Sequence, residues 1–154
     1  MAYTKLQGRR AINVIPTDDV IIPSPSDLVG SGTNDAVLAN HLEDTTGNWT
    51  NRVVPGATVY NTTANTVATV TKVTNDSLTL SADIFTATPE TYEIYNTNNS
   101  EGPVLFVGTG GALEIKTVGG DLVTLVNIAD ASFIPVMVST VQAATTCSDI
   151  IALW

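Results

Sequence analysis

Residues 104–120, VLFVGTGGALEIKTVGG, decide the fold that we predict for this chain. In the second half of this stretch, apolar Leu113 and Ile115 alternate with charged residues. This is the two-residue period of a strand with one buried face. Gly119 and Gly120 then predict a tight hairpin turn, because adjacent glycines readily adopt the positive φ that such a turn needs. The stretch therefore predicts antiparallel strands.

The remainder of the C-terminal third continues the same pattern. Residues 122–128 form the predicted return strand, and apolar runs at 133–141 and 149–154 predict two more strands. The glycines at 108–111 invite comparison with a phosphate-binding loop, but such a loop needs a helix after it, and strand period follows here. We interpret them as a second hairpin turn. Five short strands joined by turns predict a compact antiparallel sandwich or barrel.

Composition supports a β-rich protein and excludes some functions. The chain has 154 residues and a net charge of -9, yet charged residues make up only 14 % of it. Abundant threonine and valine with little charge is typical of β proteins, and of surfaces that neighbouring molecules cover. A neutral, threonine-rich surface explains the same composition. The acidity argues against binding to a nucleic-acid backbone, which requires many lysines and arginines.

The sequence offers little for metal or redox chemistry. It has a single cysteine, Cys147, and a single histidine, His41, so neither an intrachain disulfide nor an ordinary zinc site is expected, and we predict no cofactor. No signal peptide and no apolar run long enough to cross a bilayer are evident. We therefore expect a soluble protein made in a reducing cytosol.

The C-terminal third also resembles a known family, the head-spike base proteins of tailed phages and gene transfer agents. In that family a "YVG-GG" strand and turn, a "G-LPV-V" strand and a terminal "IVALW" recur in this order, and a "TPSD" segment precedes them. The corresponding stretches here are Leu105–Gly111, Gly119–Asp121, Phe133–Val136, Asp149–Trp154 and, more weakly, Ile15–Asp19. The family is structural, so the resemblance implies a virion part and no catalytic residues.

The spacing of these motifs predicts two domains. In the family the "TPSD" segment runs by a short connection into the "YVG-GG" strand, whereas a long stretch separates them here. We predict a β base domain from residues 1–26, with an arm at 1–9, plus residues 103–154. Residues 27–102 would be an inserted, β-barrel-like module, and insertions at surface turns cost little free energy. The insert resembles a small β module that recurs in phage virion proteins.

The predicted strands of the insert are residues 57–62, 66–73, 77–80 and 91–95. Residues 34–43 are its one helix candidate, with Asn34 or Asp35 as the cap. The alternative is an irregular β segment anchored by Leu42, Asp44 and Trp49.

Candidate catalytic residues are few. His41, Asp44 and a serine or Cys147 could be imagined as a nucleophilic triad, but no nucleophile motif marks one. Asp18 and Asp19 could serve as paired carboxylates, yet adjacent strand residues point to opposite faces. We therefore expect no enzyme. Aromatic side chains of the insert could stack on host-surface sugars, although we expect most of them in the core; they are Trp49, Tyr60, Tyr92 and Tyr95.

The sequence thus predicts a phage virion protein that assembles as a homo-oligomer, a trimer or a pentamer. We expect an accessory head component, either a vertex spike base or a capsid decoration protein, in contact with the major capsid protein or a spike or fibre. Tail, baseplate or fibre-attachment roles and glycan binding are the alternatives; no nucleic-acid or membrane partner is expected. The residues predicted to contact partners are Lys5, Arg9, Arg10, Leu122, Val126 and Trp154.

Overall fold

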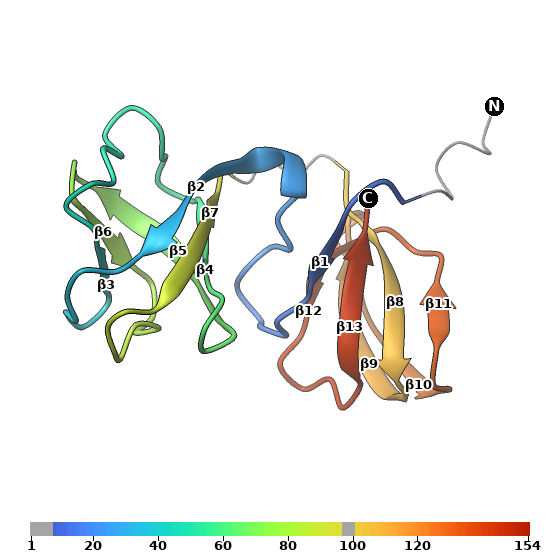
Figure 1. Ribbon diagram of the computed structural model, residues 1–154. Coiled ribbons are helices and arrows are strands. Elements are labelled where there is room, and N and C mark those ends of the chain that lie inside the picture. Colours follow the sequence, from blue (N-terminus) through green and yellow to red (C-terminus); the bar gives the residue numbers. More distant parts are fainter. Residues whose placement is uncertain (1–7, 97–100) are drawn as a thin grey trace. The chain divides into compact units, whose positions relative to one another are not determined.

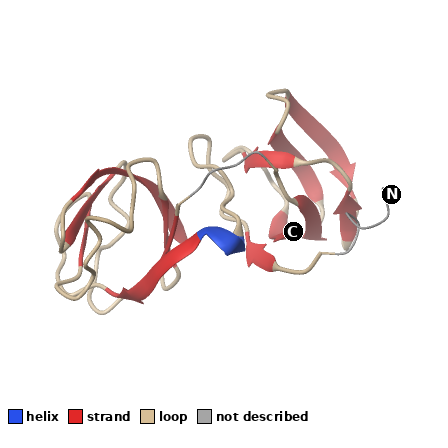
Figure 2. Cartoon of the chain, turned by 90° about the horizontal axis from the view of Figure 1, so that it is seen from above, coloured by secondary structure: helices blue, strands red, loops and turns tan. Residues whose placement is uncertain are grey.

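A computed structural model describes residues 8–96 and 101–154 of the chain (Figure 1). The chain is all-β with antiparallel strand pairing. It divides into two compact units: unit 1 comprises Met1–Pro25 and Asn99–Trp154, and unit 2 comprises Ser26–Asn98. In the described residues the only helix is the short 3-10 turn Pro25–Asp27, shown in blue in Figure 2. No described helix is long and apolar enough to cross a membrane.

Unit 1 is a sandwich of two antiparallel sheets. The first has the strand order β1-β13-β8-β11 and the second β10-β9-β12. The strands of the two sheets are Ala11–Asn13 (β1), Val104–Thr109 (β8), Gly111–Thr117 (β9), Leu122–Ile128 (β10), Ser132–Ile134 (β11), Val138–Val141 (β12) and Ser148–Leu153 (β13). Side chains from both sheets form one buried core, among them Leu105, Val107, Leu113, Ile115, Val138 and Ile150.

The glycines at 108–111 do not form the predicted hairpin turn. β8 pairs with β13 and β11, whereas β9 pairs with β10 and β12, so the chain passes from one sheet to the other between them. Gly110 lies at this crossing, where a Cβ atom would come within 2.1 Å of the Ile128 carbonyl oxygen. Glycine is therefore required by a close backbone approach. The hairpin predicted at Gly119–Asp121 is confirmed, since it joins paired strands β9 and β10, and Gly120 has a φ of 97°.

The strand predicted at 133–141 is also wrong as a single element. Pro135 interrupts it, because proline has no N–H group to donate to a neighbouring strand. The first part becomes β11 in one sheet, and the second part becomes β12 in the other. Beside β12, Thr17 donates from its backbone N–H to the Val141 carbonyl oxygen, and Ile22 to that of Ser139. Residues 17–22 therefore lie along the outer edge of β12 without forming a strand.

Unit 2 is a six-stranded antiparallel sheet with the order β2-β7-β4-β5-β6-β3. Its strands are Leu28–Thr33 (β2), His41–Glu43 (β3), Thr58–Asn61 (β4), Thr66–Val73 (β5), Ser77–Leu80 (β6) and Thr91–Tyr95 (β7). The predictions for β5, β6 and β7 are confirmed to the residue, and β4 lies inside its predicted range. A separate core fills this unit, with Trp49, Phe85, Leu42, Leu78 and Ile94 as its largest fully buried side chains.

The helix predicted at 34–43 is absent. Asn40 has a φ of 59° and His41 donates its N–H to the Leu38 carbonyl oxygen, so a turn stands where the helix would continue. β3 then pairs with β6. The alternative β interpretation is confirmed, because Leu42, Asp44 and Trp49 are all buried. Burial of the indole and of the Leu42 side chain outweighs the weak helical preference of this segment.

Candidate assembly surfaces

The imagined nucleophilic triad does not form. His41 places one ring nitrogen 2.9 Å from the Ala39 carbonyl oxygen and the other 3.2 Å from the Thr79 hydroxyl. Asp44 instead accepts hydrogen bonds from Tyr92 and Thr46. Cys147 belongs to unit 1, and burial raises the pKa of its thiol, which disfavours the reactive thiolate.

Asp18, one of the two adjacent aspartates considered as paired carboxylates, makes a structural contact. Asp18 accepts a hydrogen bond of 2.9 Å from the backbone N–H of Ala143, and therefore holds a loop in place. Across residues 8–96 and 101–154, no group of three or more histidine, cysteine, aspartate or glutamate side chains is placed to hold a metal ion.

The aromatic side chains of unit 2 are buried, as composition predicted. Trp49 and Tyr92 pack edge to face with ring centroids 6.1 Å apart, and Tyr60 and Tyr95 do so at 5.8 Å. All four side chains, with Phe85, are buried. These rings are therefore not accessible to stack on a sugar, and the idea that they form a glycan platform is wrong.

Exposed apolar side chains are concentrated on unit 1 instead. Of the twelve large apolar side chains that are exposed in the described residues, eight lie on unit 1 and four on unit 2. Those on unit 1 are Ile21, Val118, Leu122, Val123, Val126, Phe133, Val136 and Met137, and those on unit 2 are Leu28, Val37, Leu38 and Val54.

β10 carries the most exposed of these side chains. It is the edge strand of its sheet, and Leu122 and Val126 are 61 % and 64 % exposed. The strand has no charged residue and no proline, the two devices that usually protect an edge from pairing with another chain. A register irregularity with Asn127 at a φ of 57° breaks its pairing near one end. The edge is therefore long, apolar and only partly protected.

A second apolar surface covers the outer face of the sheet β1-β13-β8-β11, and we call it the outer face. Leu105 and Val107 point into the core, so Val104 and Phe106 point outward. Cross-strand register adds Leu153 beside Val104, and Ile151 and Phe133 on either side of Phe106. Figure 1 shows β13, β8 and β11 side by side in this sheet. Four of these five side chains are half-buried, and Phe133 is 42 % exposed.

Charged residues lie at both ends of this sheet. At one end, the Trp154 carbonyl oxygen accepts hydrogen bonds from the backbone N–H groups of Arg9 and Arg10, and both arginines are exposed. Arg10 also donates to the Pro25 carbonyl oxygen at 2.7 Å. At the other end Asp149 accepts a hydrogen bond of 2.9 Å from the Thr109 hydroxyl.

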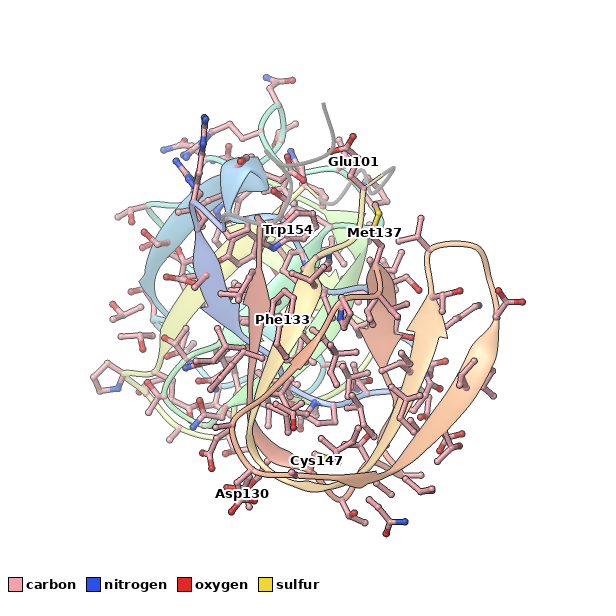
Figure 3. The ribbon with its side chains drawn as sticks, turned by 90° about the vertical axis from the view of Figure 1, so that its right-hand side faces the viewer. Glu101, Asp130, Phe133, Met137, Cys147 and Trp154 are labelled. Atoms are coloured by element: carbon pink, nitrogen blue, oxygen red, sulfur yellow. The ribbon has the colours of Figure 1, made fainter. Side chains whose placement is uncertain are left out.

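Asp149 belongs to this surface by its position. A Cβ atom on Gly108, which would point outward next after Phe106, would lie 2.7 Å from the Asp149 Cβ atom. Asp130 lies at the same end, where it accepts from the Gly110 N–H at 2.8 Å. Figure 3 shows Trp154 and Asp130 at opposite ends of unit 1, with Phe133 between them.

Trp154 has an unusual environment. Its indole Nε1 atom is buried, and it is the one such side-chain nitrogen or oxygen without a hydrogen-bond partner in the described residues. Of the terminal strand predicted at 149–154, alternate residues fill the core. Ile150 and Ala152 are buried there, whereas Ile151, Leu153 and Trp154 are half-buried. A strand has two faces, and the second face of β13 points outward.

The predicted contact residues thus fall in two places. Leu122 and Val126 share β10, and Arg9, Arg10 and Trp154 meet at one end of the sheet β1-β13-β8-β11; Lys5 lies outside the described residues. Sequence reasoning missed the outer face. Its signal was present in the uninterrupted apolar runs Val104–Val107 and Ile150–Leu153, which are typical of strands covered on both faces. No family model, curated protein or solved structure matches this chain.

Proposed function

We propose that this chain is a structural protein of a bacteriophage virion, without enzymatic activity. In this proposal it is an accessory head component, a vertex spike base or capsid decoration protein, and assembles on the particle as a homo-oligomer through unit 1. The sequence motifs that resemble spike base proteins support it, and those of the C-terminal third lie in the strands and turns of unit 1. Contact with the major capsid protein or with a spike or fibre follows from the same resemblance.

The observation that carries the proposal is the exposed edge of β10. Leu122 and Val126 are more than half exposed on a strand whose outer edge offers backbone N–H and C=O groups to another chain. Such an edge promotes aggregation of a free monomer. In an assembly it is stabilising, because an added strand hydrogen-bonds to these backbone groups and buries the side chains. An assembled state explains why the chain keeps an edge of this kind.

The test compares two charged double variants. Leu122→Lys with Val126→Lys should abolish higher oligomers of the purified protein, measured by analytical ultracentrifugation, and its incorporation into particles, measured by immunogold labelling. The matched control is Val37→Lys with Leu38→Lys on unit 2, where both side chains are 51 % exposed. The control should assemble normally.

The number of subunits at each site then distinguishes the possible positions of the protein on the particle. Five subunits in a map of the particle would fit a vertex, and three would fit a decoration site or a fibre attachment. Labelling confined to the tail would favour the tail or baseplate alternative. Particles that never contain the chain would refute a virion role.

A further inference from the structure

We infer that residues 8–22, which we call the clamp, exchange between two copies of this chain. In the exchanged pair, the clamp of each copy lies on the edges of β13 and β12 of the other, and makes there the contacts that it makes within one chain. These contacts do not involve β10 and require no particle, so the inference goes beyond the proposed function.

The clamp covers the edges of two different sheets. Its first part is β1, which pairs with β13, and the Val14 N–H extends this pairing to the Ile150 carbonyl oxygen at 2.9 Å. Three residues later, the Thr17 N–H donates to the Val141 carbonyl oxygen of β12 at 2.7 Å. Three residues span about 10 Å, the usual distance between packed sheets. The edges of β13 and β12 therefore lie on the same side of the sandwich.

Apolar side chains of the clamp complete the core of unit 1. Val14 and Ile22 belong to this core, and Ile12 packs against it. The other buried side chains of the core all lie between Leu105 and Ala152 in the sequence. The core is therefore assembled from two separate pieces of the chain.

Unit 2 is the covalent connection between these two pieces, because it comprises Ser26–Asn98. It has its own core, and its first and last strands pair with each other. Unit 2 therefore stays intact whether the clamp attached to it lies on its own chain or on a second copy. An exchange of identical elements reproduces the contacts of the closed chain, and is for this reason a low-cost route to a dimer.

The clamp is also held in a way that permits exchange. β1 is three residues long and lies at the edge of its sheet, and the segment after it contacts β12 through the N–H groups of Thr17 and Ile22. Edge segments with few backbone hydrogen bonds open locally with a smaller free-energy change than inner strands. Pro16 and Pro23 disfavour helix and inner-strand pairing, so a released clamp stays extended.

The protein concentration decides between the closed and the exchanged form. A flexible tether typically holds its ligand at an effective concentration on the order of millimolar. Copies at a comparable concentration, in solution or side by side in an assembly, therefore compete with the closed chain for the clamp.

A cross-strand disulfide reports which chain supplies the clamp. Asn13 lies opposite Ile151, and both side chains point away from the core, because their neighbours Ile12 and Ala152 point into it. The Cα atoms of such a pair are about 4.5 to 5.5 Å apart, which suits a disulfide. In a Cys147→Ala background, Asn13→Cys with Ile151→Cys should cross-link one chain in the closed form and two chains in the exchanged form.

The experiment mixes equal amounts of isotope-labelled and unlabelled protein, warms the mixture below its melting temperature and then oxidises it. Raising the concentration from about 10 μM to about 1 mM should move most of the cross-linked protein from the monomer to the dimer band of a non-reducing gel. Mass spectrometry should find cross-linked peptides with one labelled and one unlabelled half. The matched control is Glu114→Cys with Thr124→Cys, a pair within the β9–β10 hairpin, which should cross-link within one chain at both concentrations.

A second pair keeps the test decisive if the first variant does not fold. Ala11→Cys with Leu153→Cys is the next pair on the same face of β1 and β13. The Leu122→Lys with Val126→Lys variant should still exchange its clamp, which separates this inference from the proposed function. Disulfides confined to single chains at both concentrations, or dimers that disappear with the β10 substitutions, would overturn the inference.

Discussion

Tyr92 donates its phenolic hydrogen to the carboxylate of Asp44 in the interior of unit 2, and so joins β7 to the residue that follows β3. Burial alone would raise the pKa of Asp44, but hydrogen bonds from Tyr92 and from the hydroxyl and backbone N–H of Thr46 outweigh it and lower that pKa below its usual value. The carboxylate therefore stays charged while it is buried, and the bond carries the strength of a charge-assisted contact.

Removing this hydrogen bond should destabilise unit 2. Tyr92→Phe keeps the ring that packs against Trp49 and Phe85 but leaves Asp44 with one donor fewer. We expect a loss of about 1.5 to 3 kcal/mol in the free energy of unfolding, the usual range for a hydrogen bond to a charged group. Urea unfolding followed by Trp49 fluorescence measures it in a Trp154→Phe background, where Trp49 is the one remaining tryptophan.

Tyr95→Phe is the matched control, because it removes a hydrogen bond from Tyr95 to the half-buried Glu93. It should cost less, since water can replace the lost donor at Glu93 more easily than at buried Asp44. Equal losses from the two variants would contradict the special role given to Asp44.

Alkaline pH should weaken unit 2. Burial is the main cause that raises the pKa values of Tyr60, Tyr92 and Tyr95, and nearby carboxylates raise them further. A raised folded-state pKa stabilises the fold fully below the unfolded pKa of about 10, and this stabilisation is lost as pH rises through the folded value. We expect the urea midpoint reported by Trp49 to fall above about pH 10. A midpoint that stays constant to strongly alkaline pH would contradict this.

Acid should act on the same unit through Asp44. Its lowered pKa contributes stability that is present above the unfolded value of about 4 and is lost as pH falls through the lower folded value. Asp44→Asn should therefore flatten the decline in the urea midpoint of unit 2 below about pH 4. The variant will be less stable at neutral pH, so the slope with pH is the quantity to compare. An unchanged slope would assign the acid sensitivity to other carboxylates.

Local pattern predicted the strands better than their pairing. The alternation from Thr66 to Val73 and the turn at Gly119–Asp121 are decided by neighbouring residues, and the structure confirms both. The crossing at Gly110 depends on a contact with Ile128, far along the chain, which periodicity does not contain. The segment around Asn40 failed for the same reason, because the burial of Leu42 and Trp49 overrides its helical spacing.

Candidate surface residues were predictable only in part. Leu122 and Val126 stood out as apolar positions on a predicted strand, but their exposure depends on β10 being at an edge, which follows from tertiary pairing. The outer face needed the cross-strand register of β8, β11 and β13, and Phe133 joins it through a strand whose end at Pro135 was missed.

The crossing glycine gives a sharp stability prediction. Gly110→Ala places a Cβ atom 2.1 Å from the Ile128 carbonyl oxygen, so the backbone must shift. We expect a loss of about 1 to 3 kcal/mol or more in the free energy of unfolding of unit 1, as for other overpacked sites. The control is Gly119→Ala, whose nearest neighbour would be the Asp121 carboxylate at 3.5 Å. Thermal unfolding followed by Trp154 fluorescence in a Trp49→Phe background measures both. A mild effect at residue 110 would contradict the close approach.

The terminal strand should be essential to unit 1. β13 lies between β1 and β8 and contributes Ile150 and Ala152 to the core. Deleting residues 150–154 removes the strand pairing on both sides and apolar side chains worth roughly 1.5 to 3 kcal/mol each, comparable with the net stability of a small domain. The truncated chain should lose the cooperative unfolding of unit 1, seen by circular dichroism. An unchanged melting temperature would refute this packing.

The indole nitrogen of Trp154 allows a milder test in the same place. Trp154→Phe removes a buried N–H that has no partner in the described residues, and this gain should offset much of the lost apolar area. We expect it to change the free energy of unfolding by less than about 1 kcal/mol, whereas Trp154→Ala should cost more. Equal losses from both variants would indicate that the N–H has a partner.

The last prediction is that unit 1 folds without unit 2. The first and last strands of unit 2 pair with each other, with Leu28 opposite Tyr95, and the Asn96 N–H donates to the Asp27 carbonyl oxygen at 3.0 Å. The segment that enters unit 2 and the segment that leaves it therefore run side by side, about 5 Å apart as in any antiparallel pair. A two-residue Asn-Gly turn in place of residues 28–95 should close that gap without straining unit 1.

The shortened chain should keep the sandwich core of unit 1 and unfold cooperatively, measured by circular dichroism and Trp154 fluorescence. If the proposed function is correct, it should also still join the particle, and any binding to a host surface that belongs to unit 2 should disappear. The control is the full chain with Val37→Lys and Leu38→Lys, which keeps unit 2 and changes only its surface. A shortened chain without β structure would show that unit 1 depends on unit 2 for folding. A folded one that no longer joins the particle would move the particle contacts to residues 28–95.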